Sequence, residues 1–221
     1  EAWRANPYAK RIIDLITDYT VGDGIAPLAP GEIGRFVDAF WHHPQNRLDL
    51  RLPDLMDELS RAGDLFLALF RNPADGMSYV RAVPKSEIVE IVTAENDWER
   101  ELAYVVTSDG TDTKYEIRDT SEERASELVS RISNLVSGGK VFLSPAHPDA
   151  AAAEAVMVHY SINRPVGALL GESELGSILP ALRWYNRMLE DRVRLNWAAR
   201  AFLWFVTVPP GRVNAKAEQY S

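Results

Sequence analysis

The sequence has no cysteine, no excess of positive charge and no long hydrophobic run. Its 221 residues contain 24 Lys and Arg against 32 Asp and Glu, a formal net charge of −8. The absence of cysteine excludes disulfides, thiolate zinc sites and cysteine nucleophiles, and it fits a reducing compartment. Basic side chains supply most of the affinity of proteins for nucleic acid, so the acidic balance argues against a protein that grips DNA. No apolar run is long enough to span a bilayer, so we expect no membrane partner.

Phosphate-binding and catalytic motifs are also missing. No Gly-Lys-Ser or Gly-Lys-Thr occurs, and Gly22-Asp23-Gly24 is not followed by a glycine at dinucleotide-binding spacing. The segment Gly171–Gly176 lacks the glycine that a serine-hydrolase turn needs two residues after the serine, because Leu175 stands there. We therefore predict no enzymatic activity, no catalytic residue, no metal and no cofactor.

Histidines and carboxylates are the remaining candidates for chemistry. The histidines are either adjacent, so that their side chains diverge, or isolated, which favours surface or capping roles over a metal site: His42, His43, His147 and His159. Paired carboxylates could act on a sugar or phosphate ester, but acidic residues this dense on a helix are typical of a solvated surface: Asp49, Asp54, Asp57 and Glu58. We expect the same for the acids around Trp98, which are Glu95, Asp97, Glu99 and Glu101.

Hydrophobic periodicity predicts an α+β fold with N-terminal helices, an antiparallel sheet and one long helix. Helices are expected at 8–19, 30–41 and 52–62, and again at 120–136. Strands are expected at 65–70, 79–83, 88–93, 102–107, 141–143 and 156–162, with a hairpin over 104–117 around Asp109-Gly110 and a surface loop at 146–154. After the long helix, 202–208 has β character, and 213–220 could begin another helix.

The long helix, 178–203, is the most informative segment. It would be about 39 Å long, roughly the width of a domain of this size. Its apolar residues recur at helical spacing and predict a contact with another element or another copy of the chain: Leu182, Leu189, Val193 and Trp197, following Leu179. It also carries the main concentration of positive charge, which either forms ion pairs between helices or faces phosphate: Arg183, Arg187, Arg192, Arg194 and Arg200.

Several segments, in order and spacing, resemble the portal proteins of tailed bacteriophages. The first is Asn6–Asp14 running into Asp18–Ile25, which is similar to the portal N-terminal region. The second is Leu55–Leu59 leading through Gly63–Phe66, which resembles a passage from helix to strand in the portal wing domain. The third is Gly171–Leu175 followed by the long helix, which resembles the entry into the first stem helix.

The resemblance implies a ring-forming subunit, usually of a dodecamer, at one vertex of the viral head, assembled in the host cytoplasm. It divides the chain into a wing-like α+β domain over 1–170, a stem helix over 171–203 and the start of a clip over 204–221. Double-stranded DNA would pass through the ring weakly and without sequence preference during packaging and ejection, with Arg187 and Arg194 as the channel residues. A terminase motor and neck or adaptor proteins would be the partners, and we expect the second stem helix, tunnel loop and crown to lie beyond this sequence.

Two other interpretations stay open at this stage. A non-viral α+β scaffold could dimerise through the long helix as a coiled coil. A hydrolase could use Asp54, Asp57 and Glu58, which would require a pocket that perturbs one carboxylate.

Overall fold

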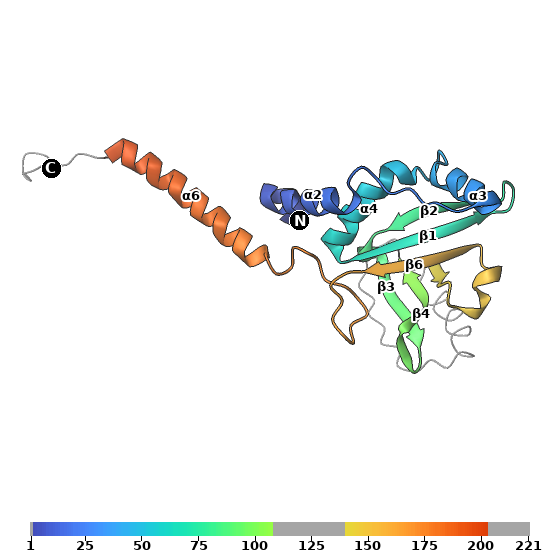
Figure 1. The fold of residues 1–221 in the computed structure, drawn as a ribbon. Coiled ribbons are helices and arrows are strands. Elements are labelled where there is room, and N and C mark those ends of the chain that lie inside the picture. The colour runs from blue at the N-terminus through green and yellow to red at the C-terminus, as the bar shows by residue number, and fades with distance from the viewer. Residues whose placement is uncertain (1, 108–139, 203–221) are drawn as a thin grey trace, which may run out of the picture. The chain divides into compact units, whose positions relative to one another are not determined.

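The computed structural model describes residues 2–107 and 140–202 and shows an α+β fold, as predicted (Figure 1). Helices α1 (Ala2–Ala5), α2 (Pro7–Val21), α3 (Gly31–Trp41) and α4 (Leu48–Ala62) come first, a six-stranded sheet follows, and helix α6 (Leu179–Phe202) comes last. The chain divides into two compact units, Glu1–Leu179 and Pro180–Ser221. None of the helices in the described ranges combines the length and apolar character that crossing a bilayer requires.

The sheet has the strand order β2-β1-β6-β5-β4-β3. Its strands are β1 (Asp64–Asn72), β2 (Met77–Val83), β3 (Ile88–Ala94), β4 (Asp97–Val106), β5 (Lys140–Leu143) and β6 (Ala155–Ser161). Neighbouring strands are antiparallel, except that β5 and β6 run parallel where Leu143 lies opposite Val156. The predicted antiparallel sheet therefore has one parallel pair, because the segment with the short 3-10 helix η2 (Pro148–Ala152) carries the chain back before β6 begins.

The predicted helices and strands in the described ranges are confirmed, with two shifted starts. Helix α4 begins at Leu48 instead of residue 52, because Leu48 is buried in the core and draws an extra turn into the helix ahead of Pro53. Strand β4 begins at Asp97, which pairs with Ala94 across a tight turn. The predicted hairpin over 104–117, the helix at 120–136 and the elements predicted after residue 202 lie wholly or partly outside the described residues.

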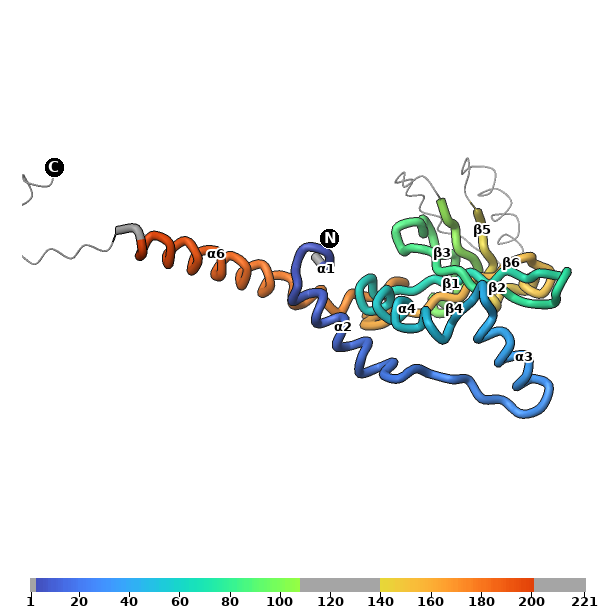
Figure 2. Tube along the Cα trace, turned by 90° about the horizontal axis from the view of Figure 1, so that it is seen from above, coloured from blue at the N-terminus to red at the C-terminus, as the bar shows by residue number. Residues whose placement is uncertain are grey.

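Helices α2, α3 and α4 lie on one face of the sheet, as the side and top views show (Figures 1 and 2). Side chains on β1 alternate between two hydrophobic clusters, so its buried part packs on both faces, as the continuous apolar run predicts. The cluster facing the helices is built on Leu48, Leu55, Leu65 and Val80. The cluster on the opposite face is built on Phe66, Ala68, Tyr104, Val106, Phe142 and Met157.

A buried asparagine protects the outer edge of β2. The Asn46 side chain accepts a hydrogen bond from Val80 N–H at 3.0 Å and donates one to the Ser78 carbonyl at 2.9 Å. It thereby makes the two bonds that a further strand would make, while its own exposure is 0%. Because open strand edges invite pairing with other chains, Asn46 closes this part of the edge to strand addition.

Candidate functional site

Helix α6 carries the residues that the sequence predicts to contact other subunits and DNA. With 24 residues it is about 36 Å long. Successive residues turn by about 100° around the axis of an α-helix, so the α6 side chains fall on three faces whose centres are about 100–155° apart. The leucine face contains Leu182, Leu189, Val193 and Trp197; the tryptophan face contains Trp184, Met188 and Leu195; the arginine face contains Arg183, Arg187 and Arg194.

Both apolar faces of α6 are exposed along most of their length. On the leucine face, Leu182 is 8% exposed, but Val193 is 68% and Trp197 is 72% exposed. On the tryptophan face, Trp184 is 72% and Leu195 is 71% exposed. The tryptophan face was not among the contacts predicted from the sequence, although its spacing of four and then seven residues is a helical signal.

The tryptophan face is grooved, whereas the arginine face offers free positive charge. A surface groove of about 410 Å³ is lined by Trp184, Met188 and Leu195 and, along its charged side, by Arg187, Asp191 and Arg192. Its shape suits side chains of a second helix. Arg187 and Arg194 are exposed, and neither forms an ion pair with Glu190 or with any other carboxylate in the described part of the chain. Their guanidinium groups are therefore available to an external anion.

The segment before α6 is fastened to the end of α4. The Gly171 N–H donates to Asp64 Oδ1 at 2.7 Å, and the Glu174 N–H donates to the Ser60 carbonyl at 3.0 Å. Gly63 ends α4 with φ of 81°, and a Cβ atom there would lie 2.6 Å from the Glu172 carbonyl carbon. Only glycine satisfies both the left-handed backbone and this close approach.

A buried network of charged groups also holds this segment, Gly171–Glu174, in place. His159 Nε2 lies 2.9 Å from Asp64 Oδ1, and His159 Nδ1 lies 2.9 Å from Glu101 Oε1. Lys85, in the 3-10 helix η1 (Lys85–Glu87), pairs with Asp64 Oδ2 at 2.5 Å and donates to the Gly171 carbonyl at 3.2 Å. The Tyr104 hydroxyl donates to Glu101 Oε2 at 2.6 Å. The network thus joins β1, β4, β6 and η1 to the segment before α6.

Both nitrogens of His159 face carboxylates, so the imidazolium form, which donates from both, fits this position. Burial by itself lowers the pKa of His159, but the hydrogen bonds and charges of Glu101 and Asp64 outweigh burial and raise that pKa. Burial, together with the hydrogen bond to Glu101, raises the pKa of Tyr104. With both nitrogens engaged, His159 has no free lone pair to act as a general base, and we interpret the network as structural.

The structure corrects two expectations from the sequence. His159, predicted to have a surface or capping role, has a side chain that is 1% exposed, and Glu101, predicted to face water, has one that is 11% exposed. Both are buried because β4 and β6 bring the two side chains within hydrogen-bonding distance, where the His159 ring also stacks on Phe66. The signal that could have revealed His159 is its place as a polar residue within the apolar run of β6.

The other predicted candidates have ordinary structural surroundings. His147 is buried and accepts from the Asp149 N–H, which is the expected capping role in a buried position. Of the candidate carboxylates, Asp57 accepts from the Thr17 hydroxyl at 2.5 Å, Glu58 pairs with Arg61, and Asp49 and Asp54 are exposed. No group of side chains within the described ranges is arranged as a metal site.

Comparison with known proteins adds no family to this description. No protein-family model matches the chain, and no curated protein matches it.

Proposed function

We propose that this chain is a subunit of the portal ring of a tailed bacteriophage, the channel through which double-stranded DNA enters and leaves the viral head. The kind of ring is proposed from the sequence resemblance to portal proteins. The main support for the proposal is the arrangement of three faces on α6. A helix inside a ring needs one contact surface for each of its two neighbours and a third surface toward the channel.

In a closed ring, every subunit contacts two neighbours through two different surfaces. The leucine face and the tryptophan face of α6 are two such surfaces, both exposed in the single chain. A two-fold coiled coil, as in the alternative scaffold interpretation, uses a single apolar seam and would leave the second face in water. Burying apolar area contributes about 25 cal/mol per Å², so covering both faces favours assembly with neighbours on two sides.

The arginine face lies between the two apolar faces and would point into the channel. Arg187 and Arg194 lack carboxylate partners among the described residues, so they can contact passing phosphates. A channel must release DNA as readily as it contacts it, and a few exposed arginines in an acidic protein meet this condition. DNA contact is therefore weak and independent of sequence.

The test is a pair of charge insertions, one on each apolar face. Leu189→Asp and Leu195→Asp each place a carboxylate in a contact that assembly would bury, at a cost of several kcal/mol. Full-length protein is imaged by negative-stain electron microscopy, and its mass is measured in solution. Wild type should form rings with a central hole, and both variants should stay small while keeping their helix content. Arg183→Asp, on the arginine face, is the matched control and should still form rings.

Mixing the two variants separates a ring from a dimer. Head-to-tail contact joins the intact leucine face of Leu195→Asp to the intact tryptophan face of Leu189→Asp, so the mixture should give a heterodimer that cannot grow. In a two-fold dimer, Leu195→Asp alone should still dimerise, and the mixture should contain no new species. A wild-type mass of two subunits would refute the portal proposal.

A further inference from the structure

Two unusual surfaces lie at opposite edges of the sheet. Strand order places β3 at one edge and β2 at the other, and both edges belong to the unit Glu1–Leu179. The tip of the β3–β4 hairpin, residues 95–99, carries an exposed tryptophan among acidic residues. The β2 edge, beneath α3, has an apolar cavity with arginines beside it.

The exposed tryptophan is Trp98, which is 65% exposed. Ala94 pairs with Asp97 and Thr93 pairs with Glu101, so residues 98–100 form a bulge on β4 between these two pairs. Bulges of this kind redirect side chains and are often functional. Tryptophan is also the residue type that most often anchors protein interfaces, because it buries a large area at little entropic cost.

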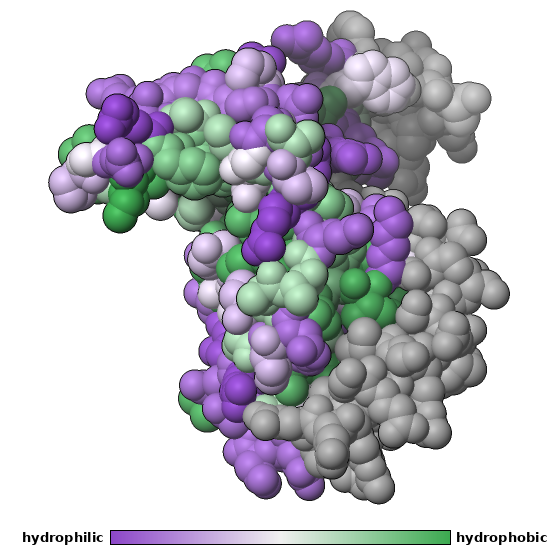
Figure 3. Space-filling model, turned by 90° about the vertical axis from the view of Figure 1, so that its right-hand side faces the viewer, coloured by the Kyte–Doolittle hydropathy of each residue, from purple (hydrophilic) through white to green (hydrophobic). Residues whose placement is uncertain are grey.

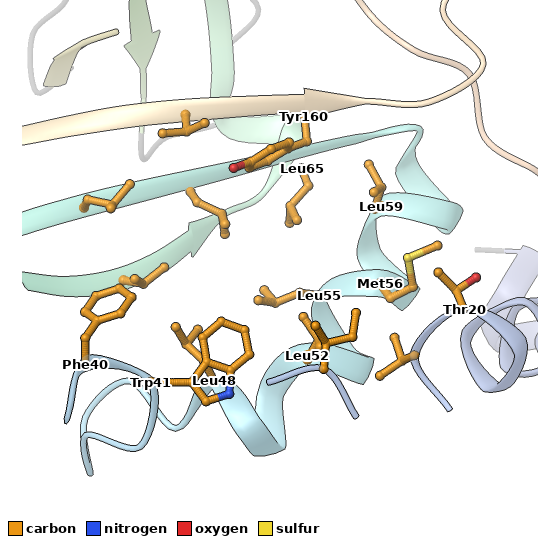
Figure 4. Close-up of a pocket in the computed structure, with 16 residues that line it drawn as sticks. Thr20, Phe40, Trp41, Leu48, Leu52, Leu55, Met56, Leu59, Leu65 and Tyr160 are labelled. Carbon is orange, nitrogen blue, oxygen red and sulfur yellow. The ribbon is translucent and has the colours of Figure 1, made fainter. Parts of the chain in front are cut away.

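The cavity lies between α3 and the ends of β1 and β2. It has a volume of about 380 Å³, and the residues that line it include Phe36, Phe40, Trp41 and Leu69. A second apolar cavity of about 410 Å³ adjoins it and shares Phe40, Trp41 and Leu69. Figure 4 shows the side chains of Phe40 and Trp41 directed into the space between helices and sheet. In Figure 3, hydrophobic residues (green) lie on the lobe that projects at the upper left and in the recess below it.

Helix α3 covers this cavity only loosely. It is amphipathic, yet none of its residues is buried, and Ile33 and Phe36 are 68% and 49% exposed. An amphipathic helix that buries no residue has an apolar face still to be covered. The cavity beneath α3 therefore has room for a large apolar side chain from outside.

The two surfaces have complementary charges. The hairpin tip carries Glu95, Asp97 and Glu99, all exposed and without an ion pair within the described residues, and the basic residue Arg100 follows them. Near the cavity, each acidic residue of α3 has a basic partner close by in the chain: Glu32 pairs with Arg35, and Asp38 pairs with His42. Asp49 lies in the first turn of α4, where the helix dipole stabilises a negative charge. Three arginines there have no carboxylate partner among the described residues: Arg47, Arg51 and Arg81.

We propose that the tip of the β3–β4 hairpin of one subunit docks on the β2 edge of the next, with Trp98 in the cavity beneath α3 and Glu99 facing Arg47. The occupant is a second copy of this chain, and the inference rests on the proposed ring. Two different surfaces at opposite edges of one sheet make a head-to-tail contact, which is the kind that closes into a ring. Because Asn46 already occupies the β2 backbone, side chains rather than an added strand make this contact.

The test compares ring assembly in variants of full-length protein, measured by mass against protein concentration. Trp98→Ala should raise the concentration for half assembly about tenfold or more, as expected for a buried interface anchor. The matched control is Tyr19→Ala, which removes an aromatic side chain that is 89% exposed on α2 and should change nothing.

A charge exchange tests the pairing itself. Glu99→Arg and Arg47→Glu should each weaken assembly, and the double variant should recover most of the loss. Neither side chain has a bond that these changes would break within the described residues, so folding should be unaffected, which circular dichroism checks. Rings that form normally with Trp98→Ala, or a double variant no better than the singles, would overturn the docking while leaving the portal proposal intact. A wild type without rings would instead refute the portal proposal.

Discussion

His159 offers the sharpest test of how the structure is held together. Its two ring nitrogens each lie 2.9 Å from a buried carboxylate oxygen, on Asp64 and Glu101. Replacing His159 with Gln removes the positive charge and leaves Lys85 and Arg164 as the ion-pair partners of the two carboxylates among the described residues. Breaking a buried ion pair from one side costs about 3–5 kcal/mol. For a chain of this size, that lowers the melting temperature by about 6–20 °C.

The same contact makes stability depend on pH. The folded-state pKa of His159 is raised above its ordinary value of 6.5, so the folded protein holds the proton more tightly than the unfolded chain does. The stabilisation is complete below pH 6.5 and is lost as pH rises through the raised folded pKa. The difference in unfolding free energy between wild type and His159→Gln should therefore be largest in mild acid and shrink in mild alkali.

Urea unfolding, followed by circular dichroism at a fixed protein concentration from about pH 6 to about pH 9, measures this difference. His43→Gln is the matched control, because His43 only accepts a backbone hydrogen bond and touches Tyr79 at the surface, and it should change stability by less than about 1 kcal/mol. A difference for His159→Gln that stays constant or grows with pH would refute the imidazolium assignment.

Three further predictions concern Gly63 at the end of α4, Asn46 at the edge strand β2, and the arginines of α6. Gly63→Ala should destabilise the fold by more than Gly76→Ala does in urea unfolding, because both glycines have positive φ but only at Gly63 would the Cβ atom meet backbone, at 2.6 Å. Asn46→Ala should cost about 2–4 kcal/mol, since it leaves two β2 backbone groups unpaired, and hydrogen exchange at the Val80 amide should speed up. Rings carrying Arg187→Glu and Arg194→Glu should still assemble but package DNA poorly; normal packaging would show that these arginines pair between subunits instead.

The α+β class, the short helices, most strands and the long helix could be predicted from the sequence because each depends on local periodicity. Asn6 before Pro7 caps α2, and the 65–70 run reads as a strand buried on both faces, because these signals involve neighbours in the chain. The leucine face of α6 follows from helical spacing alone. The spacing of Trp184, Met188 and Leu195 allows the tryptophan face to be predicted in the same way.

Only the tertiary structure decided which polar residues are buried and what they meet. Asp64, Glu101 and His159 are up to 95 residues apart, and each looks like a surface residue until the order β1-β6-β5-β4 brings them together. The pairing of Asn46 with β2 and the close approach of Gly63 to Glu172 likewise depend on distant segments. Local pattern sets the elements, because backbone hydrogen bonding and periodic burial act over a few residues. The partners of a charge depend on strand order, which short-range pattern does not encode.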